Sequence, residues 1–446
     1  MCIRDSLYNA AICISEGNLV ETYFKQILPN YKEFDEKRYF EKGDKNKIIK
    51  IKNIPIGLSI CEDIWSEAFV NNLVDEGAEI ILNLSASPYT TSKKETRKKM
   101  LSSYYKKYQR PIVYVNQTGG QDELVFDGSS LILGSSEKSL VELKSFEIDS
   151  LNFEYRDSKF NFLNSCLTND QNYLKDVYDA LVLGTKDYVE KNNFRGVLIG
   201  SSGGIDSALT AAIAYDALGK GRVKTIMMPF DFTADISIED AGLLAKNLGI
   251  EHSEISIKEM YESFSLALKE SFEGMGIDKT EENLQSRCRG VTLMALSNKL
   301  GFLVLTTGNK SEAAVGYSTL YGDTAGGFSV LKDVSKTLVY ELANYRNSLS
   351  VVIPKRIIER PPSAELAPDQ KDTDSLPDYD RLDPIIEMYV EDDKSIQEII
   401  NEGFDEKEVR RIVSLIDFNE YKRRQAPPGV KLSLKAFGKE RRYPIT

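Results

Sequence analysis

The chain has 446 residues, of which 41% are hydrophobic and 28% are charged, and its formal net charge is −11. This length favours two domains, and the acidic balance argues against nucleic-acid binding, which relies on a basic surface. No apolar run approaches the roughly 20 residues of a membrane span, and residues 1–20 lack the pattern of a signal peptide. We therefore expect a cytoplasmic protein without a membrane partner. The five cysteines have no CxxC spacing, and the single histidine excludes mechanisms that need two.

The first third of the chain predicts strands separated by loops and one helix. Residues 7–25 read as a hairpin with a Glu-Gly-Asn turn, followed by a polar loop rich in aromatic residues. Ile54–Ile60 is a continuous apolar strand that ends abruptly at Cys61. A helical segment through Val74 and a second buried strand at 79–84 complete this part.

Cys61 stands where a buried strand turns sharply into a helix, which is typical of a nucleophile elbow. A cysteine in that position is more often a small core residue, but here Glu62 and Asp63 follow it directly. Lys25 also ends an apolar strand, where a lysine has no packing reason to be. A nucleophilic thiolate needs a base to take its proton and a cation to stabilise the oxyanion, and Lys25 can supply the cation. We therefore predict that Cys61 and Lys25 are catalytic.

Four stretches of this region carry a family resemblance: FKQILPNYKEFDEKRYF, SICEDIW, NLSASPY and YVNQTGGQDELVFDGSS. Over about residues 7–140 they resemble the nitrilase-type (carbon–nitrogen hydrolase) glutaminase domain of glutamine-dependent NAD synthetases. The resemblance implies an α-β-β-α sandwich in which Cys61 attacks the glutamine amide and Lys25 stabilises the oxyanion. It also implies residues that hold glutamine or line its pocket: Tyr31, Glu62, Ser87, Lys93 and Glu123.

The general base of this family is a glutamate on an early strand, well before the lysine. Only 24 residues precede Lys25 here, and Glu16 and Glu21 lie within the hairpin itself. We therefore expect a partial sandwich with its N-terminal part missing, and little glutamine hydrolysis. If the chain does hydrolyse glutamine, Glu62 and Glu123 are the candidates for the base.

The stretch RGVLIGSSGGIDSALTAAIAYDAL at 195–218 dominates the second half of the chain. A buried strand at 197–199 ends in a Ser/Gly loop, and a helical pattern starts at once. Backbone N–H groups of such a loop, together with the positive end of the helix dipole, can hold a pyrophosphate. Asp206 would repel phosphate unless a divalent cation lay between them, so it indicates Mg²⁺. The loop is neither a Walker A loop nor a GxGxxG loop.

The order of the predicted elements around this loop indicates the fold. A helix at 170–193 precedes it, and a strand at 223–228, a helix at 238–248 and strands at 252–257 and 302–307 follow. This alternation predicts a doubly wound parallel sheet with ligands at the carboxyl ends of its strands. We expect the domain boundary near residue 165, with one domain at 1–165 and the other at 166–446.

The octet GSSGGIDS resembles the SGGxDS loop of the ATP pyrophosphatases, which cut ATP to AMP and pyrophosphate while adenylating a substrate. The stretches ENLQSRCRG, TTGNKSE, YGD, PPSAEL and YKRRQAPP then resemble, in order, the signature stretches of NAD synthetases over about residues 171–428. The resemblance implies a Rossmann-like sheet of the ATP-pyrophosphatase type. Ser363 stands where threonine is commoner, and Leu320 where ammonia-only relatives have a lysine.

The second resemblance implies three sets of ligand-binding residues. ATP would be held by Gly200, Ser201, Ser202, Gly203, Gly204, Ile205, Asp206, Ser207, Thr307, Lys336 and Ser363. Deamido-NAD⁺ would be held by Asn283, Arg287, Glu312, Tyr317, Ser318, Thr319, Leu320 and Lys422. Mg²⁺ would be bound by Asp206 and Glu312. The acidic loop at 367–380 is expected to be a mobile lid.

These features predict a ligase that adenylates the nicotinate carboxylate of deamido-NAD⁺ with ATP and displaces AMP with ammonia from glutamine. We also expect a homo-oligomer. Three alternatives stay open: an ammonia-only NAD synthetase, another ATP-pyrophosphatase ligase, and a nucleotide-binding protein without turnover. AMP formation separates the last alternative from the enzymes, and the carboxylate acceptor separates the ligases from one another.

Overall fold

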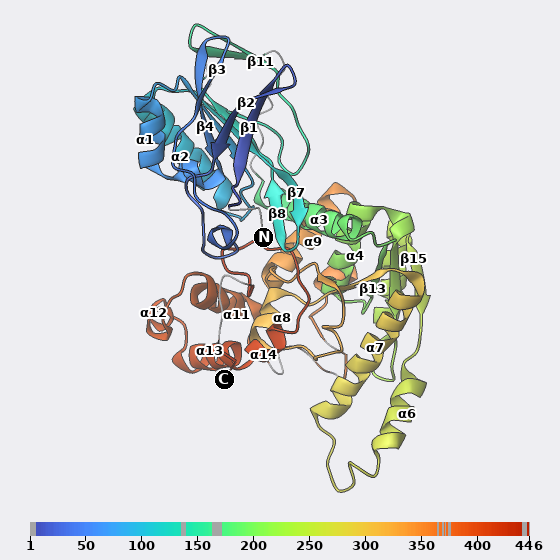
Figure 1. Ribbon diagram of the computed structural model, residues 1–446. Helices are drawn as coiled ribbons and strands as arrows, with labels where there is room; N and C mark the ends of the chain where they lie inside the picture. Colours follow the sequence, from blue (N-terminus) through green and yellow to red (C-terminus); the bar gives the residue numbers. More distant parts are fainter. Residues whose placement is uncertain are drawn as a thin grey trace, which may run out of the picture. The chain divides into compact units, whose positions relative to one another are not determined.

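The computed structural model describes residues 6–134, 140–162, 172–363, 365–367, 370, 372, 376–438 and 444–445. They form two compact units (Figure 1). The first comprises Met1–Gly119 and Val125–Asp176, and the second comprises Gly120–Leu124 and Val177–Thr446. The domain boundary expected at 165/166 lies outside the described residues. The short segment Gly120–Leu124 therefore belongs to the second unit although it lies within the sequence of the first.

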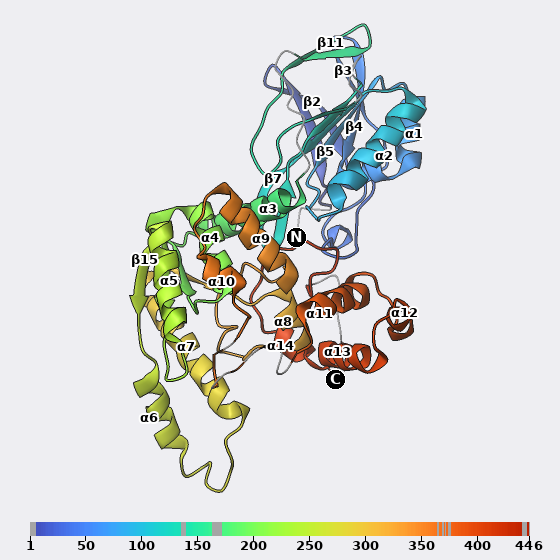
Figure 2. The ribbon, with the colours of Figure 1, turned by 180° about the vertical axis from the view of Figure 1, so that it is seen from behind.

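The first unit is built on a six-stranded mixed sheet with the strand order β10-β9-β6-β5-β4-β3. The bounds of these strands are β3 (Ile48–Ile51), β4 (Ile54–Ile60), β5 (Ile80–Ser85), β6 (Ile112–Asn116), β9 (Leu131–Leu133) and β10 (Leu140–Glu142). The strands β4, β5 and β6 are parallel to one another, and the pairs β3–β4, β6–β9 and β9–β10 are antiparallel. Helices α1 (Glu67–Asp75) and α2 (Lys93–Tyr108) lie beside this sheet in both views (Figures 1 and 2).

Three two-stranded ribbons accompany the larger sheets. They are β1 (Ala10–Ser15) with β2 (Asn18–Phe24), β7 (Thr118–Gln121) with β8 (Leu124–Asp127), and β11 (Phe153–Arg156) with β12 (Lys159–Phe162). The first ribbon is the hairpin predicted from the sequence. Its Tyr23 packs into the same apolar core as Leu58, Phe69 and Leu101, so β2, β4 and both helices share one core.

The second unit contains a five-stranded parallel sheet with the order β15-β14-β13-β16-β17. Its strands are β13 (Val197–Gly200), β14 (Val223–Met227), β15 (Glu251–Glu254), β16 (Leu303–Thr306) and β17 (Phe328–Ser329). Its main helices are α3 (Tyr173–Lys191), α4 (Ile205–Leu218), α5 (Asp235–Leu248), α6 (Lys258–Leu268), α7 (Lys279–Leu300), α8 (Lys310–Val315) and α9 (Lys336–Leu349). The predicted doubly wound parallel sheet is confirmed.

The strand order fixes where a ligand can bind in the second unit. The first strand, β13, lies between β14 and β16, so the chain moves outward on one side and then returns to the other. At such a reversal the two connections leave opposite faces of the sheet and open a crevice at the carboxyl ends of the strands. β13 ends at Gly200, directly before the Ser/Gly loop.

The C-terminal helices α11 (Tyr379–Ile386), α12 (Ile396–Asn401) and α13 (Glu406–Phe418) form a separate cluster in Figure 1. Leu382, Ile399 and Ile412 are fully buried there and give this cluster its own apolar core. α8 supplies Ala314 and Val315 to the same core, which joins the helical cluster to the sheet. Among the described residues, no helix combines the length and the apolar character needed to cross a bilayer.

Candidate active sites in the two units

Cys61 follows the last residue of β4 and has a φ of 46°, in the left-handed region that a cysteine rarely adopts. The turn is held by Asp63, which is fully buried and accepts a hydrogen bond of 2.7 Å from the Tyr23 hydroxyl. The same carboxylate accepts bonds from the backbone N–H groups of Ile60, Gln26 and Ile27 at 2.9, 3.1 and 2.8 Å. Strained backbone of this kind costs about 1–3 kcal/mol and is characteristic of functional turns. The geometry is that of the predicted elbow.

Lys25, the predicted oxyanion-stabilising residue, is 1% exposed. Its ammonium donates to both carboxylate oxygens of Glu36, at 2.7 and 2.9 Å. A buried ammonium requires such a partner, because an unpaired charge would lose its hydration without compensation. Glu36 thus fixes the position of the cation. Sequence reasoning missed Glu36, although its loop, FDEKRYF, is part of the stretch that carries the resemblance.

The Cys61 thiol is partly buried, and burial raises its pKa, whereas the charge of Lys25 opposes this shift. The thiol therefore requires a base before it can act as a nucleophile. Glu62 follows in sequence, and its carboxylate accepts a hydrogen bond of 2.7 Å from Tyr31. The Lys93 ammonium lies 4.0 Å from the centre of the Trp65 ring, and burial lowers the pKa of this lysine. Elements on either side of the elbow thus bring polar groups near it.

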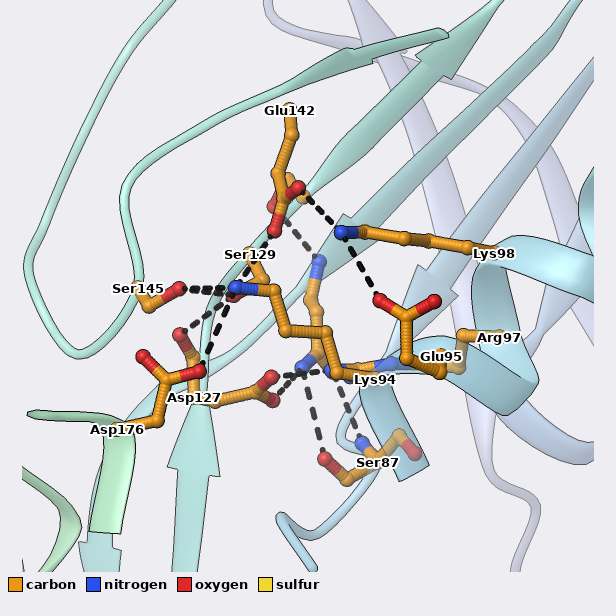
Figure 3. A network of polar contacts seen from close by, with 12 residues as sticks. Ser87, Lys94, Glu95, Arg97, Lys98, Asp127, Ser129, Glu142, Ser145 and Asp176 are labelled. Atoms are coloured by element: carbon orange, nitrogen blue, oxygen red, sulfur yellow. Dashed lines mark hydrogen bonds and ion pairs between the residues drawn. The ribbon is translucent and has the colours of Figure 1, made fainter. Parts of the chain in front are cut away.

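Ser87 belongs to a network that holds the loop after β5 (Figure 3). The Asn116 side chain accepts a bond from the Ser87 N–H at 2.9 Å and donates to Asp127 at 3.1 Å. Asp127 is fully buried and pairs with Arg97 of α2, which is 1% exposed. On the same helix, Lys94 and Lys98 both contact Glu142. These buried contacts fix the backbone of the predicted glutamine-binding serine.

The Ser/Gly loop of the second unit lies between β13 and α4. Gly203 has a φ of 75°, and a Cβ atom there would lie 2.3 Å from the Ser237 carbonyl oxygen, so only glycine fits. Inside the loop, the Ser207 hydroxyl accepts from the Ser202 N–H at 3.2 Å and donates to the Gly204 carbonyl at 3.0 Å. The N-cap residue Gly204 makes no side-chain hydrogen bond to the start of α4. The N-terminus of this helix thus presents N–H donors to which an anion can bind.

Three side chains from three elements meet beside this loop. The Lys336 ammonium, at the start of α9, lies 2.5 Å from an Asp206 oxygen and 3.1 Å from a Glu312 oxygen. Asn309 donates to the other Asp206 oxygen at 2.8 Å. Burial raises the pKa of Glu312 to about 7, the Asp206 charge acts in the same direction, and Lys336 opposes it. The site therefore concentrates negative charge that a single ammonium balances in part.

A cavity of about 310 Å³ opens beside the loop and these three side chains. Its lining includes most of the predicted nucleotide-binding residues: the whole loop from Gly200 to Ser207, Thr307, Glu312, Tyr317, Ser318, Lys336, Ser363 and Lys422. Four predicted residues are not in its lining: Asn283, Arg287, Thr319 and Leu320. The predicted residues that line the cavity come from β13, α4, α8, α9 and the C-terminal segment, so they lie far apart in sequence.

The four residues outside the lining contact one another. The Thr319 hydroxyl donates to the Asn283 side chain at 2.8 Å, and the Arg287 guanidinium donates to the Leu320 carbonyl at 3.2 Å. Lys422 donates to the carbonyl oxygens of Gly316 and Ser318, at 2.7 and 2.9 Å. Together these contacts hold the loop after α8.

Arg289, which the sequence did not single out, lines the cavity. It donates to the carbonyl of Met228, the residue directly after β14, at 3.1 Å, and burial lowers its pKa. Arg287 and Arg289 are two positions apart on α7, and residues with that spacing point to different sides of a helix. The helical period alone could have shown that only one of them faces the cavity, but not which one.

Glu123 is a predicted residue of the glutamine pocket. It lies in the second unit, where its carboxylate pairs with Lys332 at 3.1 Å. Its predicted role in lining the glutamine pocket, or in serving as the base, stays a prediction. The sequence resemblance covered a continuous stretch, whereas the structure assigns five residues of that stretch to the other unit.

The fold and the two sites define a two-part α/β enzyme, with an elbow thiol in one unit and a nucleotide cavity at the switch point of a parallel sheet in the other. The family model described as "NAD synthase" matches residues 177–426, and the model described as "Carbon-nitrogen hydrolase" matches residues 3–151. The glutamine-dependent NAD(+) synthetase of Acinetobacter baylyi is 48% identical over 442 residues, which are 98% of this chain and 81% of that protein. The chain belongs to the family of glutamine-dependent NAD(+) synthetases, and it is an enzyme of NAD biosynthesis.

Two further relatives support the same family assignment. The glutamine-dependent NAD(+) synthetase of Thermotoga maritima is 45% identical over 479 residues, covering 99% of this chain and 83% of that protein. The structure of the glutamine-dependent NAD⁺ synthetase of Acinetobacter baumannii, in complex with ADP, is similar with a TM-score of 0.77. It is 45% identical, and the match covers 99% of this chain and 81% of that chain.

Proposed function

We propose that the chain converts deamido-NAD⁺ to NAD⁺ by ATP-dependent amidation through an adenylated intermediate. The observation that carries this proposal is the meeting of Asp206, Glu312 and Lys336 beside the Ser/Gly loop in one cavity. A carboxylate is a poor electrophile for ammonia, so the nicotinate oxygen first attacks the α-phosphorus of ATP, and pyrophosphate leaves. Ammonia then attacks the activated carbonyl carbon, and AMP leaves.

The loop and α4 carry out the phosphate binding in this proposal. The uncapped N–H groups at the start of α4 and the loop backbone bind phosphate oxygens, and the Lys336 ammonium neutralises charge that develops on them. Thr307, Ser363 and Lys422 line the same cavity and are proposed to hold the two nucleotides. Asn283, Arg287, Thr319 and Leu320 are proposed to orient deamido-NAD⁺ from the loop that they form.

Mg²⁺ fits the two carboxylates of this site. Asp206 and Glu312 each approach the same ammonium within 3.1 Å, so their oxygens converge on one position, and Mg²⁺ prefers such oxygen ligands. No set of three or more His, Cys, Asp or Glu side chains in the described part of the chain is arranged to enclose a metal. The remaining ligands would then be phosphate oxygens and water. When bound, Mg²⁺ would neutralise the charge of the triphosphate.

The first unit is proposed to supply the ammonia. The Cys61 thiol gives up its proton, which ends on the nitrogen that leaves, and its sulfur attacks the glutamine amide carbon. The Lys25 ammonium, held by Glu36, stabilises the resulting oxyanion. Collapse of the tetrahedral intermediate releases ammonia and leaves a thioester, which water hydrolyses to glutamate and the free thiol. Tyr31, Glu62, Ser87 and Lys93 are proposed to bind the rest of the glutamine molecule.

The test supplies ATP, Mg²⁺ and deamido-NAD⁺ with ammonia or glutamine in separate reactions and measures AMP, pyrophosphate and NAD⁺. Ammonia should support NAD⁺ formation in both the unaltered chain and Cys61→Ala, because the thiol acts only before ammonia is free. Any formation supported by glutamine should disappear in Cys61→Ala. Absence of AMP in all reactions, or release of pyrophosphate only with another carboxylate acceptor, would contradict the proposal.

We also propose that the enzyme is a cytoplasmic homo-oligomer. The segment from α6 to α7 exposes Phe264, Leu266, Met275 and Ile277, the last of them by 89%. Apolar side chains gathered in this way are typical of a surface that another chain covers. Size-exclusion chromatography with light scattering, compared between the unaltered chain and Leu266→Glu/Ile277→Glu, tests the assignment. A monomeric unaltered chain would contradict it.

A further inference from the structure

Side chains from two other helices hold the first turn of α9, where Lys336 is the first residue. The Ser311 hydroxyl of α8 accepts from the Lys336 N–H at 2.9 Å, and the Asp383 carboxylate of α11 accepts from the Thr337 N–H at 2.9 Å. Ser335 binds the next two N–H groups through its hydroxyl and its carbonyl, at 3.4 and 2.9 Å. Each of the N–H groups that a helix leaves free at its start therefore has a partner here.

Asp383 is the centre of this arrangement, because it also binds the neighbouring hydroxyls. The Ser311 hydroxyl donates to one of its carboxylate oxygens, and the Thr337 hydroxyl donates to the other at 2.8 Å. Asp383 is 8% exposed and Ser311 is fully buried, so water has little access to these contacts. Glu312 follows Ser311 directly in α8. Asp383 thus ties together the backbones of Glu312 and Lys336, whose side chains meet beside the Ser/Gly loop.

The same face of α11 also contacts the far end of the Lys336 side chain. Tyr379 and Asp383 are four positions apart, and this spacing places both on one face of a helix. The Lys336 ammonium lies 5.4 Å from the centre of the Tyr379 ring, within the range of a cation–π contact. The Tyr379 hydroxyl donates to Asp372 at 2.9 Å, which orients the ring. One face of α11 therefore holds both the backbone and the ammonium of Lys336.

We infer that Asp383 and Tyr379 are positioning residues of the nucleotide site, which act by placing the Lys336 ammonium against Asp206 and Glu312. This inference rests on the proposed function, in which that ammonium neutralises charge on the phosphates of ATP. It gives the C-terminal helical cluster a part in the reaction, although no residue of α11, α12 or α13 lines the cavity. A misplacement of about 1 Å can slow an enzymatic reaction about 100-fold, so the support of Lys336 matters for the rate.

The test measures ammonia-supported NAD⁺ formation by the full chain and, by calorimetry, the binding of a non-hydrolysable ATP analogue with Mg²⁺. Asp383→Asn turns one acceptor oxygen into a donor, so a partner of Asp383 loses its acceptor. We expect kcat to fall by about 10- to 100-fold and affinity for the analogue by about 3- to 10-fold. The KM for deamido-NAD⁺ should stay within about twofold. Ser311→Ala removes the acceptor of the Lys336 N–H without changing α11, so it tests the same effect even if Asp383→Asn does not fold.

The aromatic contact is tested by a pair of variants at Tyr379. Tyr379→Leu should lower kcat more than Tyr379→Phe, because phenylalanine keeps the ring beside the ammonium and loses only the hydroxyl. Equal kcat values in these two variants would overturn the inference for Tyr379.

Asp216→Asn is the matched control, because Asp216 holds the other end of the same helix. It pairs at 2.6 Å with Arg346, in the last turn of α9, and it does not line the cavity. At a rise of about 1.5 Å per residue, Arg346 lies about 15 Å along the helix from Lys336. Asp216→Asn should therefore lower stability and leave kcat and affinity for the analogue within about twofold.

A double variant separates positioning from a merely structural role. If Asp383 acts through Lys336, adding Asp383→Asn to Lys336→Met should change the affinity for the analogue by less than about twofold. An additional loss of affinity in the double variant, equal losses of kcat in Asp216→Asn and Asp383→Asn, or normal kcat in both Asp383→Asn and Ser311→Ala would overturn this inference alone. Failure of the unaltered chain to make NAD⁺ from ammonia would instead overturn the proposed function.

Discussion

Replacing Lys336 with methionine removes the only cation that contacts both Asp206 and Glu312 among the described residues. The side chains of these three residues are 2%, 17% and 18% exposed, so the carboxylates would be left with little water to compensate them. Removing one partner of a buried pair typically costs about 3–5 kcal/mol. Because the carboxylates retain some exposure, we expect a loss of about 3 kcal/mol in the free energy of unfolding of Lys336→Met at pH 8.

The loss should depend on pH, because Glu312 can escape the repulsion by taking up a proton. Its pKa is about 7 with Lys336 present, and removal of the lysine raises it further. At pH 5.5 Glu312 is therefore protonated, and about half of the loss should disappear. Mg²⁺ with ATP should restore stability to Lys336→Met by replacing the missing charge, although the variant should lose most of its activity.

The assay is urea unfolding at pH 8 and pH 5.5, with and without Mg²⁺ and ATP. Lys310→Met is the matched control, because Lys310 is also buried and pairs with Asp333 and Glu391, and none of these three residues lines the cavity. It should lose similar stability without additional restoration by Mg²⁺ and ATP. An unchanged midpoint in Lys336→Met, or equal losses at both pH values, would refute the reasoning.

Three other predictions concern the second unit. Gly203→Ala should abolish NAD⁺ formation from either nitrogen source, because its Cβ would collide with the Ser237 carbonyl at 2.3 Å; near-normal kcat in that variant would show that the loop tolerates the change. Lys422→Ala should raise the KM for deamido-NAD⁺ by about tenfold or more, since a charge-assisted contact contributes about 1.5–3 kcal/mol. The KM for ATP should stay within about twofold. Equal changes in both KM values would show a general loss of structure. Mg²⁺ affinity should rise about tenfold per pH unit up to about pH 7 and then level off, because Glu312, with its pKa of about 7, must lose a proton to bind the metal. Calorimetry with a non-hydrolysable ATP analogue measures this affinity. A flat profile between pH 5.5 and 7 would show that Glu312 does not bind the metal.

The loops of both candidate sites could be predicted from the sequence because each is continuous. The eight residues GSSGGIDS contain the turn, the start of the helix and the Asp206 carboxylate together, so their order alone predicts an anion site. In the same way, IPIGLSIC followed by Glu62 and Asp63 specifies a strand, an elbow and a thiol. Local backbone preferences and strand periodicity determine such features, and the structure retains β4, β13 and the start of α4 where the pattern predicts them.

Only the tertiary structure decided which distant groups meet. Lys336 and Asp206 are 130 residues apart, and no periodicity links them. The pairing of Lys25 with Glu36 depends on the path of an irregular loop, and the orientation of Arg289 rather than Arg287 toward the cavity depends on the rotation of α7 against the sheet. Glu123 shows most clearly that sequence neighbours can belong to different units. It belongs to the second unit, whereas the residues that flank the segment Gly120–Leu124 belong to the first. Sequence determines local conformation through short-range sterics and hydrogen bonding, whereas side-chain packing over the whole chain determines long-range contacts.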